Sequence, residues 1–156
     1  MLASKLLGVV GIFMMANYAA VNGRCWKSCL PTWRQWQDKC YKMHDADVTW
    51  AEGEQICVEL GGVMVVPQSE EELQHLLNMC NCDTFWIGCN DNAVEGTWVC
   101  LDEGTIGMQD KRWKDGEPND RHNQDCARWW SSGWDDMGCE STHKLICQRP
   151  VRAPVL

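Results

Sequence analysis

Eleven cysteines in a chain of 156 residues constrain this fold more than any other feature of the sequence. They are spread along the chain, and the closest pair, Cys80 and Cys82, does not have the spacing of a zinc-binding motif. In a short chain that enters an oxidising compartment, such cysteines are typical of a disulfide framework. Because eleven is an odd number, at least one thiol is free or pairs with another chain.

The first 23 residues have the pattern of a secretory signal peptide. Lys5 is followed by an apolar run over residues 6–16 and then by small residues. Val21 and Gly23 fit the −3 and −1 positions of a cleavage site, and two earlier alanines give rival ends. The alternative is an uncleaved anchor helix, for which an apolar run of this length is short.

We therefore expect a signal peptide at residues 1–23, one secreted domain at residues 24–150 and a short tail at residues 151–156. The net charge of −8 becomes −9 without Lys5, the only charged residue of the leader. Such an acidic chain is a poor partner for nucleic acid and for anionic membranes.

Hydrophobic periodicity predicts two helices. Apolar residues recur near helical spacing over residues 48–60, and two glycines then end the pattern. A second helix is expected to begin at Ser69, a typical N-cap residue followed by three glutamates that suit the first turn.

Short apolar segments rich in aromatic and branched residues predict strands on both sides of one long loop. A hairpin is expected over residues 29–41, and further strands are expected at residues 85–88, 96–99, 126–130 and 145–148. Residues 100–124 show little regular pattern, and a loop of that length in a compact domain is usually functional or disordered. The elements together predict an α+β domain.

Residues 117–139 are dense in side-chain oxygens. Carboxylates and carboxamides surround Pro118, and a second acidic pair follows Trp134. Ca²⁺ accepts six to eight oxygen ligands in irregular geometry, so this stretch suits a calcium ion. Carboxamides beside carboxylates also place donors next to acceptors, as a polyhydroxyl ligand requires. The alternative is a solvated acidic loop without an ion.

The order of these elements and several short motifs resemble the C-type lectin domain. The similarity covers about residues 29–149, and its motifs are Trp50-Ala51-Glu52, Trp86-Ile87-Gly88, Glu95-Gly96-Thr97-Trp98, Gly116-Glu117-Pro118-Asn119, Asp125-Cys126 and Ile146-Cys147. The resemblance implies a C-type lectin fold: two helices, small antiparallel sheets and a long calcium-binding loop, stapled by disulfides.

The resemblance also implies three disulfides, Cys29–Cys40, Cys57–Cys147 and Cys126–Cys139. Cys89 and Cys100 stand where the family more often has other residues, at the ends of two predicted strands, so a fourth bridge is expected, with two buried thiols as the alternative. Cysteines separated by one residue rarely bridge each other, so Cys25 is expected to pair with Cys80 or Cys82. The remaining thiol would be free or would link a homodimer.

The same resemblance implies a set of ligands for a calcium ion at the sugar site, with Pro118 in the cis form. The implied ligands are Glu117, Asn119, Gln124, Asp135 and Asp136. This chain has Gln124 where the family most often has glutamate and Asp135 where it most often has asparagine. The two departures offset each other, so the positions still supply three negative charges.

A second, auxiliary calcium site is implied at Asp91, Glu95, Asp120 and Asp125. Four carboxylates that lie close together repel each other without a cation. The alternative is that Glu95 and Asp120 are only solvated.

The resemblance implies a calcium-dependent lectin whose partners are galactose-type or mannose-type glycans, held through vicinal hydroxyls on Ca²⁺. The residues expected to contact the sugar are Glu117, Asn119, Gln124, Asp135 and Trp130. The alternative is a protein-binding or mineral-binding relative without sugar activity. We expect no enzyme, because the four histidines are scattered and no nucleophile motif is present.

Overall fold

The computed structural model describes residues 28–151, and within them two helices pack around a mostly antiparallel sheet. The helices are α1 (Trp50–Glu59) and α2 (Glu70–Cys80). The strands are β1 (Arg34–Trp36), β2 (Lys39–Val48), β3 (Val63–Met64), β4 (Thr84–Asn90), β5 (Trp98–Cys100), β6 (Gly104–Ile106), β7 (Cys126–Trp130), β8 (Gly133–Met137) and β9 (His143–Pro150). The α+β class and the two helices expected from the sequence are confirmed.

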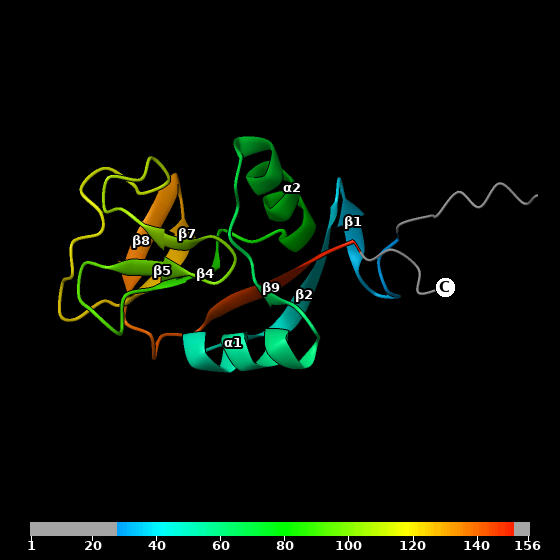
Figure 1. Ribbon diagram of the computed structural model, residues 1–156, viewed down its shortest axis with the longest axis horizontal. Coiled ribbons are helices and arrows are strands. Elements are labelled where there is room, and N and C mark those ends of the chain that lie inside the picture. Colours follow the sequence, from blue (N-terminus) through cyan, green and yellow to red (C-terminus); the bar gives the residue numbers. More distant parts are fainter. Residues whose placement is uncertain (1–27, 152–156) are drawn as a thin grey trace, which may run out of the picture.

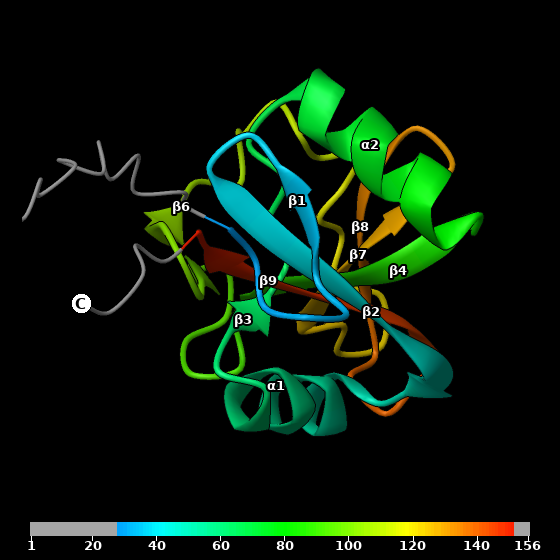
Figure 2. The same ribbon diagram turned by 90° about the vertical axis from the view of Figure 1, so that its right-hand side faces the viewer.

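Strand β9 is the centre of the sheet. It pairs antiparallel with β2 and β3, and parallel with β4 through Phe85 and Lys144. β4 then leads through β5 to β6 on one branch and through β7 to β8 on another. In Figures 1 and 2, α1 and α2 lie on opposite sides of the β2–β9 pair, and β4, β5, β7 and β8 extend away from it.

The local signals at the helix ends explain where both helices begin. Thr49 and Glu52 form a capping box at the start of α1. The side chain of Ser69 accepts a hydrogen bond from the Glu72 N–H at the start of α2, which confirms the predicted N-cap. Asn81 ends α2 in the left-handed conformation.

Two tryptophans connect β4 to the end of β2 and the start of α1. Trp50 Nε1 donates to the Ile87 carbonyl at 2.9 Å, and Trp86 Nε1 donates to the Val48 carbonyl at 2.7 Å. Both rings are buried, so their single polar atoms need these partners. Gly88 follows in β4, and a Cβ there would lie 2.8 Å from the Met64 carbonyl oxygen, so this strand crossing requires glycine.

Five disulfides lie within residues 28–151. They are Cys29–Cys40, Cys57–Cys147, Cys80–Cys82, Cys89–Cys100 and Cys126–Cys139. Four of these pairs are those expected above. The expected pairing of Cys25 with Cys80 or Cys82 is wrong, because those two cysteines are bonded to each other. The left-handed Asn81 between them reverses the chain and brings their Cα atoms to 5.1 Å.

Several strands were not predicted. β3 and β8 are absent from the predicted set, β6 lies inside the segment expected to be irregular, and β2 continues to Val48. The signal peptide, Cys25 and all but the first residue of the tail lie outside the described residues, so those expectations stay predictions. Within residues 28–151, neither helix has the length and hydropathy needed to cross a bilayer.

Candidate functional site

Three carboxylates meet at the end of the long loop. Glu117 comes from the loop, and Asp135 and Asp136 come from β8. One carboxylate oxygen from each lies within 4.8 Å of the others, and both aspartates are buried. Buried carboxylates this close, without a basic group for each, have the composition of a site for a hard cation.

Asp136 organises the loop around this cluster. Its two oxygens accept the Asn119 N–H at 3.1 and 3.0 Å, and Oδ2 also accepts the Asp120 N–H at 2.6 Å. The Glu117–Pro118 peptide bond is cis. The Asn119 side-chain amide donates to Glu117 Oε2, so Asn119 joins the group of expected ligands.

Gln124 lies at the margin of the cluster. Its backbone N–H donates to Asp120 Oδ1 at 2.9 Å, and its side-chain Nε2 contacts the Met137 sulfur at 3.9 Å. The structure therefore brings four of the five expected ligands into one group and places the fifth beside it, on the flank next to β8.

The electrostatics of the cluster favour a bound cation. Burial raises the pKa of Glu117 to about 7, with further contributions from a hydrogen bond to Asp136 and from the negative charges of Asp135 and Asp136. A bound cation would stabilise the ionised form of this carboxyl against both its burial and the two neighbouring negative charges. A divalent cation with oxygen preference fits this donor set.

A second carboxylate group forms from Asp91, Glu95 and Asp125, whose oxygens also lie within 4.8 Å of one another. Asp91 is 3% exposed. Its Oδ2 accepts the Gly96 N–H at 2.8 Å, whereas its Oδ1 is buried without a hydrogen-bond partner among residues 28–151. Burial, with the charges of Glu95 and Asp125, raises the pKa of Asp91 to about 6. The orphaned oxygen and the crowding fit a second cation.

Asp120 does not join this second group. Its Oδ1 caps the Gln124 N–H, and Asp120 itself has a positive φ of 49°. It does line a cavity of about 130 Å³ between the two carboxylate groups, which is also bordered by Asp91, Glu95 and Asp136. Asp120 thus lies between the two carboxylate groups, and its expected role as a ligand of the auxiliary ion stays a prediction.

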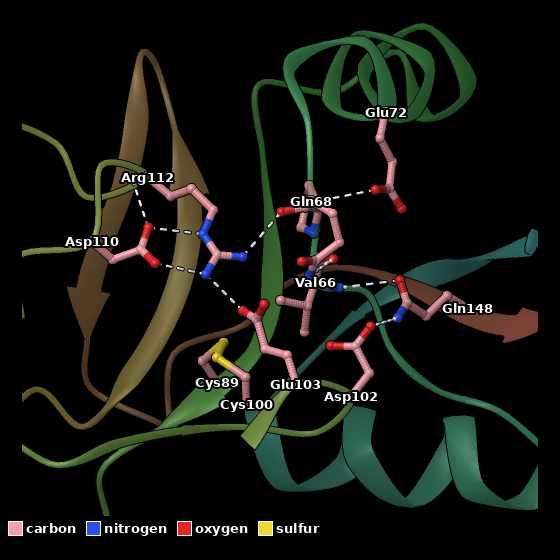
Figure 3. Close-up of polar contacts among 11 residues, drawn as sticks. Val66, Gln68, Glu72, Cys89, Cys100, Asp102, Glu103, Asp110, Arg112 and Gln148 are labelled. Atoms are coloured by element: carbon pink, nitrogen blue, oxygen red, sulfur yellow. Dashed lines mark hydrogen bonds and ion pairs between the residues drawn. A yellow bond between two sulfur atoms is a disulfide. The ribbon is translucent and has the colours of Figure 1, made fainter. Parts of the chain in front are cut away.

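Arg112 connects two parts of the long loop to the segment before α2. Its guanidinium lies 2.8 Å from Asp110 and 2.7 Å from Glu103, and Nη1 donates to the Pro67 carbonyl at 3.3 Å (Figure 3). The same guanidinium lies 4.4 Å from the centroid of the Trp134 ring. Since Trp134 is in β8, these contacts hold the loop against the strand that carries two of the three carboxylates.

An aromatic stack completes this support. The Trp113 ring packs edge-to-face between Trp98 at 4.6 Å and Trp134 at 5.7 Å. Backbone hydrogen bonds join the same segments: Trp134 N–H donates to the Arg112 carbonyl, and Lys114 N–H donates to the Trp134 carbonyl. A loop without helix or strand over residues 107–125 is thus held by buried tryptophans.

The site predicted from the sequence did not include one residue that the structure places in it. Arg128 in β7 lies opposite Asp135 in β8, and its Nη2 is 2.6 Å from Asp135 Oδ2. The three negative charges counted from the sequence therefore have one positive charge beside them. The sequence offers no signal for this contact, because it depends on the register of β7 against β8. Two residues further along β7, the expected sugar-stacking residue Trp130 is 44% exposed, with Lys114 Nζ 4.2 Å from its ring centroid.

Comparisons with known proteins identify the family of this domain. Residues 46–149 match the family model described as the lectin C-type domain. The chain is 34% identical over 126 residues to C-type lectin domain family 4 member M of Symphalangus syndactylus, an alignment that covers 79% of this chain and 30% of that protein. The chain thus spans about a third of the length of such curated relatives.

Solved structures show the same fold. The C-type carbohydrate-recognition domain of cow CD23, solved in the presence of a GlcNAc2Man3 oligosaccharide, superposes with a TM-score of 0.72 at 29% identity, covering 81% of this chain and 98% of that one. A calcium-independent type II antifreeze protein superposes with a TM-score of 0.70 at 25% identity, covering 80% of this chain and 96% of that one.

Proposed function

This chain belongs to the C-type lectin domain family, and from that premise we propose that it is a secreted, calcium-dependent carbohydrate-binding protein. The observation that carries the proposal is the cluster of Glu117, Asp135 and Asp136, with Asn119 joined to it by a hydrogen bond. The proposed role is binding, without catalysis. The partners are glycans, and Cys25, the one cysteine outside the five disulfides of the described residues, is the proposed link in a homodimer.

The geometry suggests how each residue would act. Glu117, Asn119, Gln124, Asp135 and Asp136 would hold the ion. A bound Ca²⁺ supplies open coordination positions that two vicinal hydroxyls of a sugar can fill. The carboxylates accept hydrogen bonds from those hydroxyls, and the amides of Asn119 and Gln124 donate to them, so each hydroxyl has a donor and an acceptor. Trp130, at the exposed end of β7, would contact the sugar ring through the part of its ring that Lys114 and Arg128 leave uncovered.

We propose a second ion at Asp91, Glu95 and Asp125. The buried Oδ1 of Asp91 supports it, because a buried carboxylate oxygen without a partner is costly unless a cation or water satisfies it. This ion would hold the turn after β4 against the residues that precede β7. It would support the sugar site through the cavity that Asp120 and Asp136 share with Asp91.

A protein-binding or mineral-binding role without sugar activity is the second candidate. The similarity to a calcium-independent type II antifreeze protein favours it, because that protein has the same fold. Retention on immobilised sugar separates the two candidates. A lectin of the proposed kind is retained in Ca²⁺ and released by a chelator. A protein that is retained on no sugar in a broad glycan array fits the second candidate.

Calcium is expected to raise the melting temperature of the wild-type protein. An ion that binds only the native state stabilises it by mass action, by about 2.7 kcal/mol when the ion is at a hundred times its Kd. The double variant Glu117→Ala/Asp135→Ala is expected to lose most of this shift. Thermal unfolding with millimolar Ca²⁺ and with chelator measures it.

A matched control is Asp45→Ala/Glu59→Ala, which removes two exposed carboxylates from β2 and α1. It should keep the full calcium response. An identical melting curve for the wild type in Ca²⁺ and in chelator would refute the calcium proposal.

Galactose or N-acetylgalactosamine is expected to compete better than mannose for the site. In the C-type lectin family, a Glu–Asn pair such as Glu117–Asn119 is typical of mannose-type sites. On the other side of the ion, Gln124 and Asp135 exchange donor and acceptor relative to the glutamate and asparagine that the family most often has there. In mannose-type sites, a local twofold axis relates the donors and acceptors on the two sides of the ion, which suits two equatorial hydroxyls. The exchange removes that symmetry, and a hydroxyl left without its hydrogen-bond partner costs about 1–3 kcal/mol. Inhibition of glycan binding by free monosaccharides in Ca²⁺ is the measurement. Stronger inhibition by mannose would mean that the first pair decides the preference.

A further inference from the structure

Asp135 is bound by Arg128 through only one of its two oxygens. Arg128 Nε and Nη2 donate to Asp135 Oδ2 at 2.9 and 2.6 Å. The two residues face each other directly across β7 and β8, and their side chains are only 13% and 10% exposed. Because an oxygen has two lone pairs and both point to Arg128 donors, Oδ2 has little capacity for another partner. Oδ1 is the oxygen left for a cation.

The guanidinium has little freedom to move away. It lies 5.1 Å from the centroid of the Trp130 ring, and Nη1 is 3.4 Å from His143 Nε2. His143 in turn packs edge-to-face against Trp86 at 4.7 Å. Burial and the nearby positive charge of Arg128 lower the pKa of His143, so the neutral imidazole presents an acceptor to Arg128. Arg128 is therefore held by three side chains from β7, β8 and β9.

We propose that Arg128 is a positioning residue of the calcium site: it decides which atom of residue 135 faces the cation, and it makes a carboxylate at that position obligatory. This inference rests on the proposed function, because it assumes that the Glu117–Asp135–Asp136 cluster holds Ca²⁺. It explains why this chain has aspartate where the family most often has asparagine.

An asparagine beside Arg128 cannot satisfy both the guanidinium and the cation. An amide has one acceptor oxygen and one NH₂ group, whereas a guanidinium has only donors. In the variant Asp135→Asn, Arg128 takes the amide oxygen, and the NH₂ group turns towards the cation. The reverse orientation would place NH₂ against the guanidinium. In either orientation, the amide cannot satisfy both partners, although it is nearly the same size as the carboxylate.

The expected results follow a pattern in which the second substitution rescues the first. Asp135→Asn alone should weaken Ca²⁺ binding by at least about a hundredfold, because it turns an NH₂ group towards the ion in place of a ligand oxygen, whereas loss of an outer contact alone usually costs about 10- to 100-fold. Arg128→Met/Asp135→Asn should recover binding to within about tenfold of the wild type, because the amide oxygen is then free to face the ion. The measurements are calorimetric titration with Ca²⁺ alone and the calcium-induced rise in melting temperature, both without sugar.

Two further variants keep the test decisive. Arg128→Gln/Asp135→Asn provides a second rescue, since a glutamine can accept a hydrogen bond from the Asn NH₂ group. Asp47→Asn, which removes the charge opposite Lys144 at the surface, is the control and should bind Ca²⁺ as the wild type does. Circular dichroism in chelator establishes that each variant is folded.

The outcomes separate the two proposals. If the wild type itself does not bind Ca²⁺, the proposed function fails. If the wild type binds and Asp135→Asn binds equally well, Arg128 does not select the atom at position 135, and this inference fails alone. The inference is also overturned if both rescue variants fold but bind Ca²⁺ no better than Asp135→Asn, because Arg128 would then have only a structural role.

Discussion

Replacing Cys57 and Cys147 together with alanine is expected to lower the free energy of unfolding by about 4–5 kcal/mol. The bridge joins α1 to β9 and closes a loop with a sequence separation of 90 residues. A link of that span removes much of the conformational freedom of the unfolded chain. Both cysteines are fully buried, so alanine is the better replacement because serine would bury a hydroxyl without a partner. Urea denaturation of the purified variant measures the loss.

The matched control is the Cys29–Cys40 bridge, which has a separation of only 11 residues. Its removal by the same pair of substitutions should cost about 3 kcal/mol, because the loop-closure contribution grows with the logarithm of loop length. If the two double variants lost equal stability, the span of the bridge would not be the cause of its effect.

The second large effect is expected at Glu72, which is 2% exposed in the first turn of α2. Its Oε1 accepts Lys39 Nζ at 2.9 Å and the Tyr41 hydroxyl at 2.5 Å, and its Oε2 accepts the Gln68 N–H at 2.8 Å (Figure 3 shows Glu72 and Gln68). Burial and the Glu72 charge raise the pKa of Tyr41, so the phenol stays protonated and donates. Glu72→Ala should destabilise the domain by about 3–5 kcal/mol, because it leaves these donors without an acceptor.

Glu70→Ala is the comparison, since Glu70 is exposed in the same helical turn and its side chain accepts a hydrogen bond from Gln74. Its loss should change stability by no more than about 0.5 kcal/mol. Glu72→Gln should also be destabilising, because the amide would place NH₂ against either the Tyr41 hydroxyl or the Gln68 N–H. Thermal unfolding of the three variants in chelator measures these losses of stability. If Glu72→Ala melted at the same temperature as the wild type, the expected role of Glu72 would be contradicted.

The sequence predicted the helices well because their signals are local. Ser69 marks the start of α2 through its own side chain, and the apolar positions of α1 recur at a spacing that only a helix brings to one face. The strands of the loop region lacked such signals. β8 contains Trp134 and two buried aspartates in succession, so it shows neither the alternation of a half-buried strand nor the apolar run of a buried one.

The candidate ligands could be predicted because the resemblance places them by motif, but their partners could not. Arg128 reaches Asp135 only because β7 and β8 pair in one register, and no local pattern specifies that register. The Cys80–Cys82 bridge was also missed. It depends on the left-handed conformation of Asn81, which the general rule against bridging cysteines at that spacing does not consider.

The two ends of the described chain lie together, at the end of the molecule away from β7 and β8 (Figure 1). The Val151 N–H donates to the Asp38 carbonyl at 2.8 Å, which fixes the exit of β9 beside the β1–β2 turn. In Figure 1, this end of the molecule lies opposite the loops around β5 and β8. A solid surface or another polypeptide attached at either end would therefore leave the cluster of Glu117, Asp135 and Asp136 facing away from the attachment point. Copies tethered side by side would present their loops in one direction, and avidity for a multivalent surface would then depend on their spacing.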